Sequence, residues 1–177
     1  MTKLLLAAAA ALAVSGCATK PAQIDDQNNL EHASNVVLGA MRAHYTNLDD
    51  ALQGAYAFAM FPEVGEGGVV TGAAFGRGVL YEHGRPSGFV KLEQAAFSDN
   101  IGDRTFAELL VLRDQDEVDR LKRGELDLGQ ATRVVILGKH QLPTDQLRGA
   151  TVMLMPRGGA LLEASAAGQR IQFSPRG

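Results

Sequence analysis

The chain has very little cysteine, and it lacks the residue patterns of the common catalytic and metal sites. Cys17 is its only cysteine, which excludes an intramolecular disulfide and a thiol nucleophile elsewhere in the chain. The four histidines, His32, His44, His83 and His140, are scattered, and none belongs to an H-E-x-x-H motif or a Cys/His cluster. No G-x-S-x-G elbow is present. The sequence therefore predicts a protein that is not an enzyme and that needs no metal or other cofactor.

The chain also lacks a surplus of basic residues and a long apolar run. Lysine and arginine number 17 against 20 aspartates and glutamates, which gives a formal charge of −3 and no argument for nucleic-acid binding. A membrane-spanning helix needs about twenty apolar residues in a row, and no such run surrounds the glycine-rich segment. The paired carboxylates Asp25–Asp26 and Asp49–Asp50 fall at expected helix starts, where the helix dipole favours negative charge.

The N-terminus has the three parts of an exported lipoprotein signal in the required order. Lys3 supplies the charged region, and Leu4–Val14 is an apolar stretch too short to span a bilayer. VSGC, residues 14–17, resembles the lipobox of bacterial lipoproteins, in which the signal is cut before an acylated cysteine. An ordinary secretory signal with a chance cysteine is the alternative. Acyl chains such as palmitate on Cys17 predict stable membrane anchoring, because each buried methylene contributes about 0.8 kcal/mol.

This signal divides the chain into a signal peptide over 1–16, a lipidated tether over 17–27 and one domain over 28–177. Loss of Lys3 with the signal changes the formal charge from −3 to −4. Ala18 follows the cysteine, where a retention signal for the inner membrane would be aspartate. In a Gram-negative cell, this predicts a lipid-anchored protein of the outer membrane that faces the periplasm.

The most unusual internal segment is GEGGVVTGAAFGRG, residues 65–78. Its spacing fits neither the P-loop nor the dinucleotide fingerprint. If the segment is a strand, one face is nearly free of side chains and holds Gly68, Val70, Gly72, Ala74, Gly76 and Gly78. Glycine inside a strand often marks the close approach of another backbone or a ligand. We expect this face to be a close-packing surface, with a ligand floor as the alternative.

Periodicity predicts an α+β fold with two or three helices and about seven strands. The expected helices cover residues 28–45, 46–53 and 114–123, and the expected strands cover 55–61, 67–81, 87–97, 104–113, 131–138, 151–165 and 169–173. The sheet should be mostly antiparallel and curled or double-layered, with N-terminal helices and one short inserted helix. Pro62 is expected to end the first strand.

Local signals define the expected helix ends and faces. In the first helix, Leu30, Ala33, Val37, Met41 and Tyr45 form an apolar stripe with Val36 and Ala40 beside it. We expect this stripe to cover the sheet; a lipid-surface helix is the alternative, but its polar face is not rich in lysine or arginine. Thr46 is the expected N-cap of the second helix. Asp114 and Glu117 have the spacing of a capping box at the start of the third.

One long run resembles a known family. Residues 52–92, LQGAYAFAMFPEVGEGGVVTGAAFGRGVLYEHGRPSGFVKL, resemble the core of the SYLF family, a lipid-binding domain also called the yeast actin-patch-protein-related domain. The matching features are an alanine-rich strand ending in Phe61-Pro62, then Gly67-Gly68, Gly72, Gly76-Arg77-Gly78, and a hairpin through Gly84 into Gly88. Residues 125–138 and 156–171 look like the family's last strands, so the resemblance covers roughly residues 28–174.

The resemblance implies a domain that binds lipid or membrane. Eukaryotic members of the family are associated with phosphoinositides, membrane attachment and actin, whereas bacterial members are often exported lipoproteins. A bacterial periplasm should contain neither actin nor much phosphoinositide. The expected partner is therefore a membrane lipid, through the acylated cysteine and through the domain, and actin is not expected as a partner.

Three cations are the candidate contacts for an anionic headgroup. Arg77 projects from the side-chain-bearing face of the glycine-rich strand, Lys91 from the next strand, and Arg157 from a Pro-Arg-Gly-Gly turn. Arginine suits bidentate contact with phosphate, and lysine acts as a point charge; an ordinary solvated charge is the alternative for each. The sequence thus predicts a noncatalytic phospholipid-binding lipoprotein with a role in envelope maintenance. A structural or protein-interaction lipoprotein is the alternative.

Overall fold

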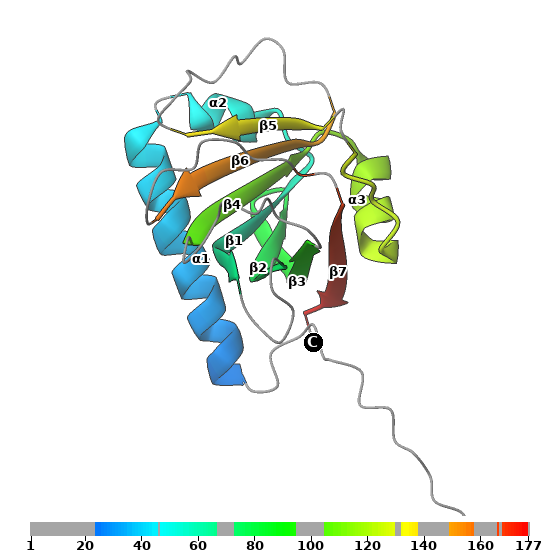
Figure 1. Cartoon of the computed structure of the whole chain (residues 1–177), viewed down its shortest axis with the longest axis horizontal. Helices are drawn as coiled ribbons and strands as arrows, with labels where there is room; N and C mark the ends of the chain where they lie inside the picture. Colours follow the sequence, from blue (N-terminus) through cyan, green and yellow to red (C-terminus); the bar gives the residue numbers. More distant parts are fainter. Residues whose placement is uncertain are drawn as a thin grey trace, which may run out of the picture.

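A computed structural model of the chain describes residues 24–45, 47–66, 73–94, 105–129, 132–137, 149–157, 166 and 168–176. In these residues, three helices and one seven-stranded sheet form the α+β fold that the sequence predicts (Figure 1). Cys17, Thr46, Gly68 and Gly72 lie outside the described residues, so the predictions made for them are not addressed by the structure.

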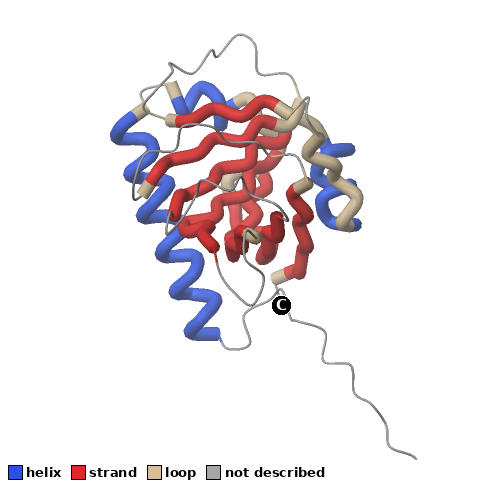
Figure 2. The backbone as a smooth tube through the Cα atoms, in the orientation of Figure 1, coloured by secondary structure: helices blue, strands red, loops and turns tan. Residues whose placement is uncertain are grey.

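The sheet is antiparallel apart from one pair of strands at its edge. The elements in chain order are α1 (Ile24–His44), α2 (Leu48–Gln53), β1 (Ala57–Glu66), β2 (Ala74–Glu82), β3 (Arg85–Gln94), β4 (Thr105–Leu112), α3 (Gln115–Arg123), β5 (Arg133–Ile136), β6 (Thr151–Pro156) and β7 (Gln169–Pro175). The strand order is β5-β6-β4-β1-β2-β3-β7, and of the described pairs only β5 and β6 run parallel. Figure 2 shows the strands together between the helices.

The sheet curls so strongly that its edge strand β7 faces β4, four strand positions away in the sheet. β1, β2 and β3 separate these two strands, so a flat sheet would hold them roughly 19 Å apart at the usual strand spacing. Gln169 of β7 nevertheless donates a hydrogen bond to Glu108 of β4, with 3.0 Å between Nε2 and Oε2. Figure 1 shows β7 turned well away from the direction of β5 and β6. The sheet therefore has a concave face inside the curl and a convex face outside it.

Apolar side chains pack on both faces of the curled sheet. On the convex face, Met41 of α1 and Leu48 of α2 pack with Met60 and other residues of the strands. On the concave face, Val118 and Leu121 of α3 pack with the strands and with the segment that follows α3. Figure 1 shows α1 and α3 on opposite sides of the sheet, with α3 beside β7. The alternation of side chains along each strand supplies both layers.

Strand β1 runs through Pro62, so the prediction that this proline ends the strand is wrong. The pairing register of β1 shifts between Met60 and Glu63 against β2, and between Phe61 and Val64 against β4. Proline has no N–H to donate, and a bulge is one of the few places in a sheet that tolerates it. The irregularity at Pro62 therefore lets the strand continue to Glu66.

Helix α1 begins at Ile24, so the predicted tether overlaps the start of the helix. Val37 and Met41 are buried, as the apolar stripe predicts, and the helix covers the convex face of the sheet. Val36, predicted to lie beside the stripe, is instead 57% exposed. The buried face of the helix includes Leu38 in its place.

Helix α3 begins and ends where the sequence predicts. The Asp114 side chain accepts a hydrogen bond from the backbone N–H of Glu117 at 2.9 Å, and the Glu117 carboxylate accepts one from the N–H of Arg113 at 2.7 Å. Gly124 ends the helix with a φ of 71°, a left-handed conformation that glycine adopts readily. At α2 the N-cap position is Asn47, and its side chain makes no capping hydrogen bond.

Candidate functional site

Two of the predicted cations face each other on neighbouring strands. Arg77 of β2 is the register partner of Lys91 of β3, and the same row continues to Glu63 of β1 and Gln172 of β7. Val79, two residues from Arg77 on the same strand, belongs to the convex apolar layer, so Arg77 points to the convex side. We call these four residues, Glu63, Arg77, Lys91 and Gln172, the convex charged row.

The two cations of this row differ in their surroundings. Lys91 forms an ion pair with Glu93, two residues along the same strand, with 2.5 Å between Nζ and Oε1. Arg77 is exposed, and no described residue forms a hydrogen bond or an ion pair with its side chain. Within the described part of the chain, the five N–H donors of the Arg77 guanidinium are therefore available to a ligand.

Arg157 joins the row from the far side of β1. Its Nη1 donates a hydrogen bond to the carbonyl oxygen of Pro62 at 2.9 Å and lies 3.9 Å from Oε2 of Glu63. Glu63 is in turn the register partner of Arg77. The three cations predicted from separate segments thus lie around one row, with the Glu63 carboxylate between Arg157 and Arg77.

The face of β2 opposite Arg77 is filled by β1. A Cβ atom on Gly78 would overlap with the carbonyl oxygen of Met60 and would lie 2.8 Å from Cδ1 of Phe61. A Cβ atom on Gly76 would lie 2.7 Å from Cγ2 of Val64. The space beside these two glycines is therefore occupied by protein, which leaves no room for a ligand there.

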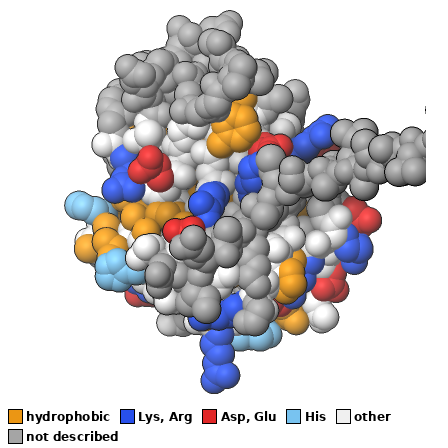
Figure 3. Space-filling view, turned by 90° about the horizontal axis from the view of Figure 1, so that it is seen from below, with side chains coloured by type: hydrophobic (Ala, Val, Ile, Leu, Met, Phe, Trp, Pro, Cys, Tyr) orange, Lys and Arg blue, Asp and Glu red, His pale blue; other side chains and the backbone are white. Residues whose placement is uncertain are grey.

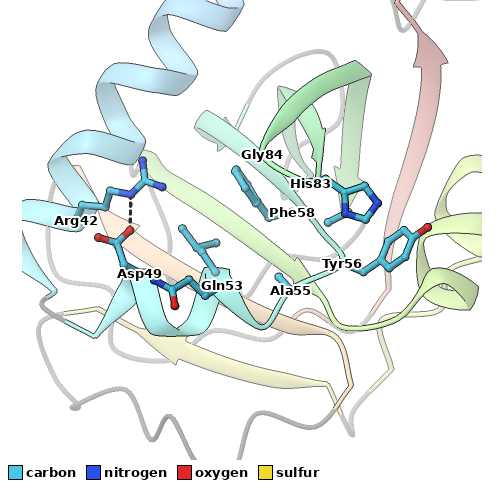
Figure 4. Close-up of a pocket in the computed structure, with 10 residues that line it drawn as sticks. Arg42, Asp49, Gln53, Ala55, Tyr56, Phe58, His83 and Gly84 are labelled. Carbon is cyan, nitrogen blue, oxygen red and sulfur yellow. Dashed lines mark hydrogen bonds and ion pairs between the residues drawn. The ribbon is translucent and has the colours of Figure 1, made fainter.

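A shallow hollow of about 440 Å³ lies between α2 and the turn that joins β2 to β3 (Figure 4). Tyr56 and His83 line it, with ring centroids 4.8 Å apart, and Arg42 and Asp49 form an ion pair at 2.7 Å on the opposite side. Its lining residues come from three separate segments, so no pattern within one segment of the sequence predicts the hollow. The dipeptide His83-Gly84 forms the turn, with φ angles of 50° and 76°. It was the one local sequence pattern that indicated part of the hollow.

The concave face holds a second feature that the sequence analysis missed. Glu108 is fully buried in the middle of the apolar run of β4. Burial raises the pKa of Glu108 to about 8, and the hydrogen bond from Gln169 opposes that increase only in part. The one sequence signal was a charged residue in the run FAELLVL, where every other residue is apolar.

Charge on the described surface is mixed rather than of one sign. In the view of Figure 3, basic and acidic side chains lie next to one another, and neither sign forms a broad field. Within the described residues, no group of three or more histidine, cysteine, aspartate or glutamate side chains could hold a metal ion. None of the helices described is both long enough and apolar enough to cross a bilayer.

Comparison with known proteins gives no relative from which a function could be carried over. No family model matches the chain, and no curated protein matches it.

Proposed function

We propose that this protein is a membrane-anchored lipoprotein whose domain binds phospholipid without catalysis, with the convex charged row and Arg157 as the headgroup contact. The lipobox at residues 14–17 and the resemblance of residues 52–92 to SYLF domains support a lipid partner. In this proposal the acylated Cys17 holds the protein on the periplasmic side of the outer membrane, where the domain contributes to envelope maintenance.

The juxtaposition of Arg77 and Lys91 is the observation that carries the proposal. Like charges directly opposite each other on neighbouring strands are unfavourable, and an anion between them offsets that repulsion. The Arg77 guanidinium can contact two phosphate oxygens at once, while the ammonium group of Lys91 adds a point charge. A phospholipid headgroup with a net negative charge therefore fits this pair better than a zwitterionic or uncharged headgroup does.

The acyl anchor lowers the affinity that the row has to provide. A tethered domain meets the membrane surface at a high effective concentration, so a weak contact is enough to orient it. The carboxylates of Glu63 and Glu93 lie close to the cations and reduce their attraction for an anion. We therefore expect weak, salt-sensitive binding to anionic lipid rather than tight binding to one headgroup.

Vesicle flotation of residues 18–177 tests the proposal without the anchor. We expect the protein to float with phosphatidylglycerol vesicles at low salt, to float less at high salt, and not to float with phosphatidylcholine vesicles. The Arg77→Ala/Lys91→Ala variant should bind at least about tenfold more weakly, because one charged hydrogen bond contributes about 1.5–3 kcal/mol and about 1.4 kcal/mol is a factor of ten.

A matched variant separates the row from net charge. Arg85→Ala/Arg123→Ala also removes two exposed positive charges, but from the β2–β3 turn and from α3. This control should float as the unmodified protein does. Equal losses of flotation in both variants would mean that net charge alone explains the binding. The absence of flotation with any vesicle would favour the protein-interaction alternative.

A further inference from the structure

Three buried polar side chains meet inside the curl of the sheet. Nε2 of Gln169, on β7, donates to Oε2 of Glu108 on β4 at 3.0 Å and to Oε1 of Gln94 on β3 at 3.2 Å. All three side chains belong to residues that are at most 4% exposed. The contact joins the edge strand β7 to β4 across the concave face. We call these residues the concave polar cluster.

Two oxygen atoms of this cluster have no donor among the described residues. They are Oε1 of Glu108 and Oε1 of Gln169, and both are buried. A buried acceptor without a donor costs about 1–3 kcal/mol, so two of them in one contact are a substantial penalty. A single proton on the Glu108 carboxyl removes that penalty, because the resulting hydroxyl donates to Gln169 while Gln169 donates to the other carboxyl oxygen.

We infer that Glu108 is an uncharged carboxylic acid in the folded protein, that it forms a cyclic acid–amide pair with Gln169, and that this pair is a pH-sensitive latch holding β7 across the curl. Release of the proton to water leaves two facing acceptors and a buried carboxylate. The carboxylate then needs water, which reaches it only when β7 moves away from β4.

The charged groups around the cluster offer the carboxylate no counter-ion. The register neighbours of Glu108 on β1 and β6 are Phe61 and Leu154. Burial raises the pKa of Glu108, and only the hydrogen bond from Gln169 acts to lower it. Two charged side chains of α3 are already engaged: Lys122 pairs with Glu82 of β2 at 2.8 Å, and the Glu117 carboxylate accepts a hydrogen bond from the backbone N–H of Arg113. Ionisation of Glu108 is thus met by no nearby positive charge in the described residues.

β7 is the strand that such a latch can control. Among the described residues, it pairs with β3 along one side, and one further bridge joins Gln169 to Leu128. Ile171, on the same side of the strand as Gln169, contributes to the concave apolar layer. Release of the latch therefore loosens one edge of the curl and leaves the convex layer in place.

Hydrogen exchange of the full-length chain in detergent, from pH 5 to pH 9, tests the inference. After correction for the intrinsic exchange rate, protection of the amides of β7 should fall as the pH passes about 8, while protection of β1 and β4 should hold. In Glu108→Gln, an amide–amide pair forms the same ring at every pH, so protection of β7 should not change with pH.

Two results would overturn the latch. One is a pH dependence of β7 in Glu108→Gln equal to that of the unmodified chain. The other is an equal loss of protection in β1 and β4, which would mean general unfolding. Infrared difference spectra of the unmodified chain give a second readout that depends on no variant: a protonated-carboxyl band should disappear with a midpoint near pH 8. A chain with no such band at pH 6 has no acid–amide pair.

Discussion

Charged side chains lie at the surface on the convex face of the curled sheet, whereas the concave face buries an ionisable side chain. On the convex face, Arg77 and Lys91 lie side by side at the surface, where solvent and the Glu93 carboxylate make two positive charges tolerable. On the concave face, Glu108 has no counter-ion in the described residues and is fully buried. The convex face therefore carries charged side chains, whereas the Glu108 carboxyl on the concave face is neutralised by a proton.

The difference follows from solvation rather than from residue type. An exposed ion pair is screened by water, so it contributes little to stability in either direction. A carboxylate in the apolar interior loses its hydration, and its neutral form is favoured instead. The convex charged row can therefore exchange its partners for a ligand at small cost, whereas the concave polar cluster is tied to the integrity of the fold.

The largest expected effect tests whether the concave side of β2 is closed. Gly78→Ala places a methyl group against the backbone of Met60, which has no flexible end to move aside. Overpacking of this kind destabilises by about 3 kcal/mol, which urea denaturation measures. The matched variant Gly39→Ala, on an open surface of α1, should stabilise by about 0.5–1 kcal/mol. Equal stability of the two variants would mean that the concave face has free space.

The next effect concerns the proton on Glu108. The folded protein holds this proton up to about pH 8, whereas the unfolded chain releases it near the ordinary value of 4.5. Between these values the unfolded state binds fewer protons, so the free energy of unfolding falls as the pH rises and levels off above about pH 8. Urea denaturation at pH 5, 7 and 9 should show this fall in the unmodified chain and a smaller one in Glu108→Gln. If the free energy of unfolding depended on pH equally in both chains, groups other than Glu108 would be responsible for the dependence.

The smallest expected effect lies on the convex face. Arg77→Ala/Lys91→Ala should change the free energy of unfolding by no more than about 0.5 kcal/mol, because exposed charges contribute little to stability. Urea denaturation beside the vesicle measurements checks this. A loss of several kcal/mol would show that the row holds the fold together, and weaker flotation of the variant would then report misfolding.

Sequence patterns predicted the features of this fold that depend on local chemistry. The capping box of Asp114 and Glu117 is an interaction between residues three apart, so the helix start could be read from the chain. Alternation placed Val90 and Leu92 on one face of β3 and Lys91 on the other. The α+β class followed from the number and spacing of such segments.

The features that the patterns missed depend on contacts distant in sequence. Glu108 and Gln169 are 61 residues apart, and they meet only because the sheet curls. The bulge near Pro62 is likewise set by pairing with two neighbouring strands at once. At the candidate site, the sequence named Arg77, Lys91 and Arg157 separately, and strand register was needed to bring them around one row.

A titration with a soluble phospholipid measures whether Arg77 and Lys91 bind a headgroup. Isotope-labelled residues 18–177 would be titrated with short-chain phosphatidylglycerol below its micelle concentration, and the backbone amide shifts followed by NMR. The account predicts saturable shifts centred on Arg77 and Lys91 that disappear in Arg77→Ala/Lys91→Ala. Shifts confined to the hollow beside Tyr56 and His83, or no saturable shifts at all, would contradict it.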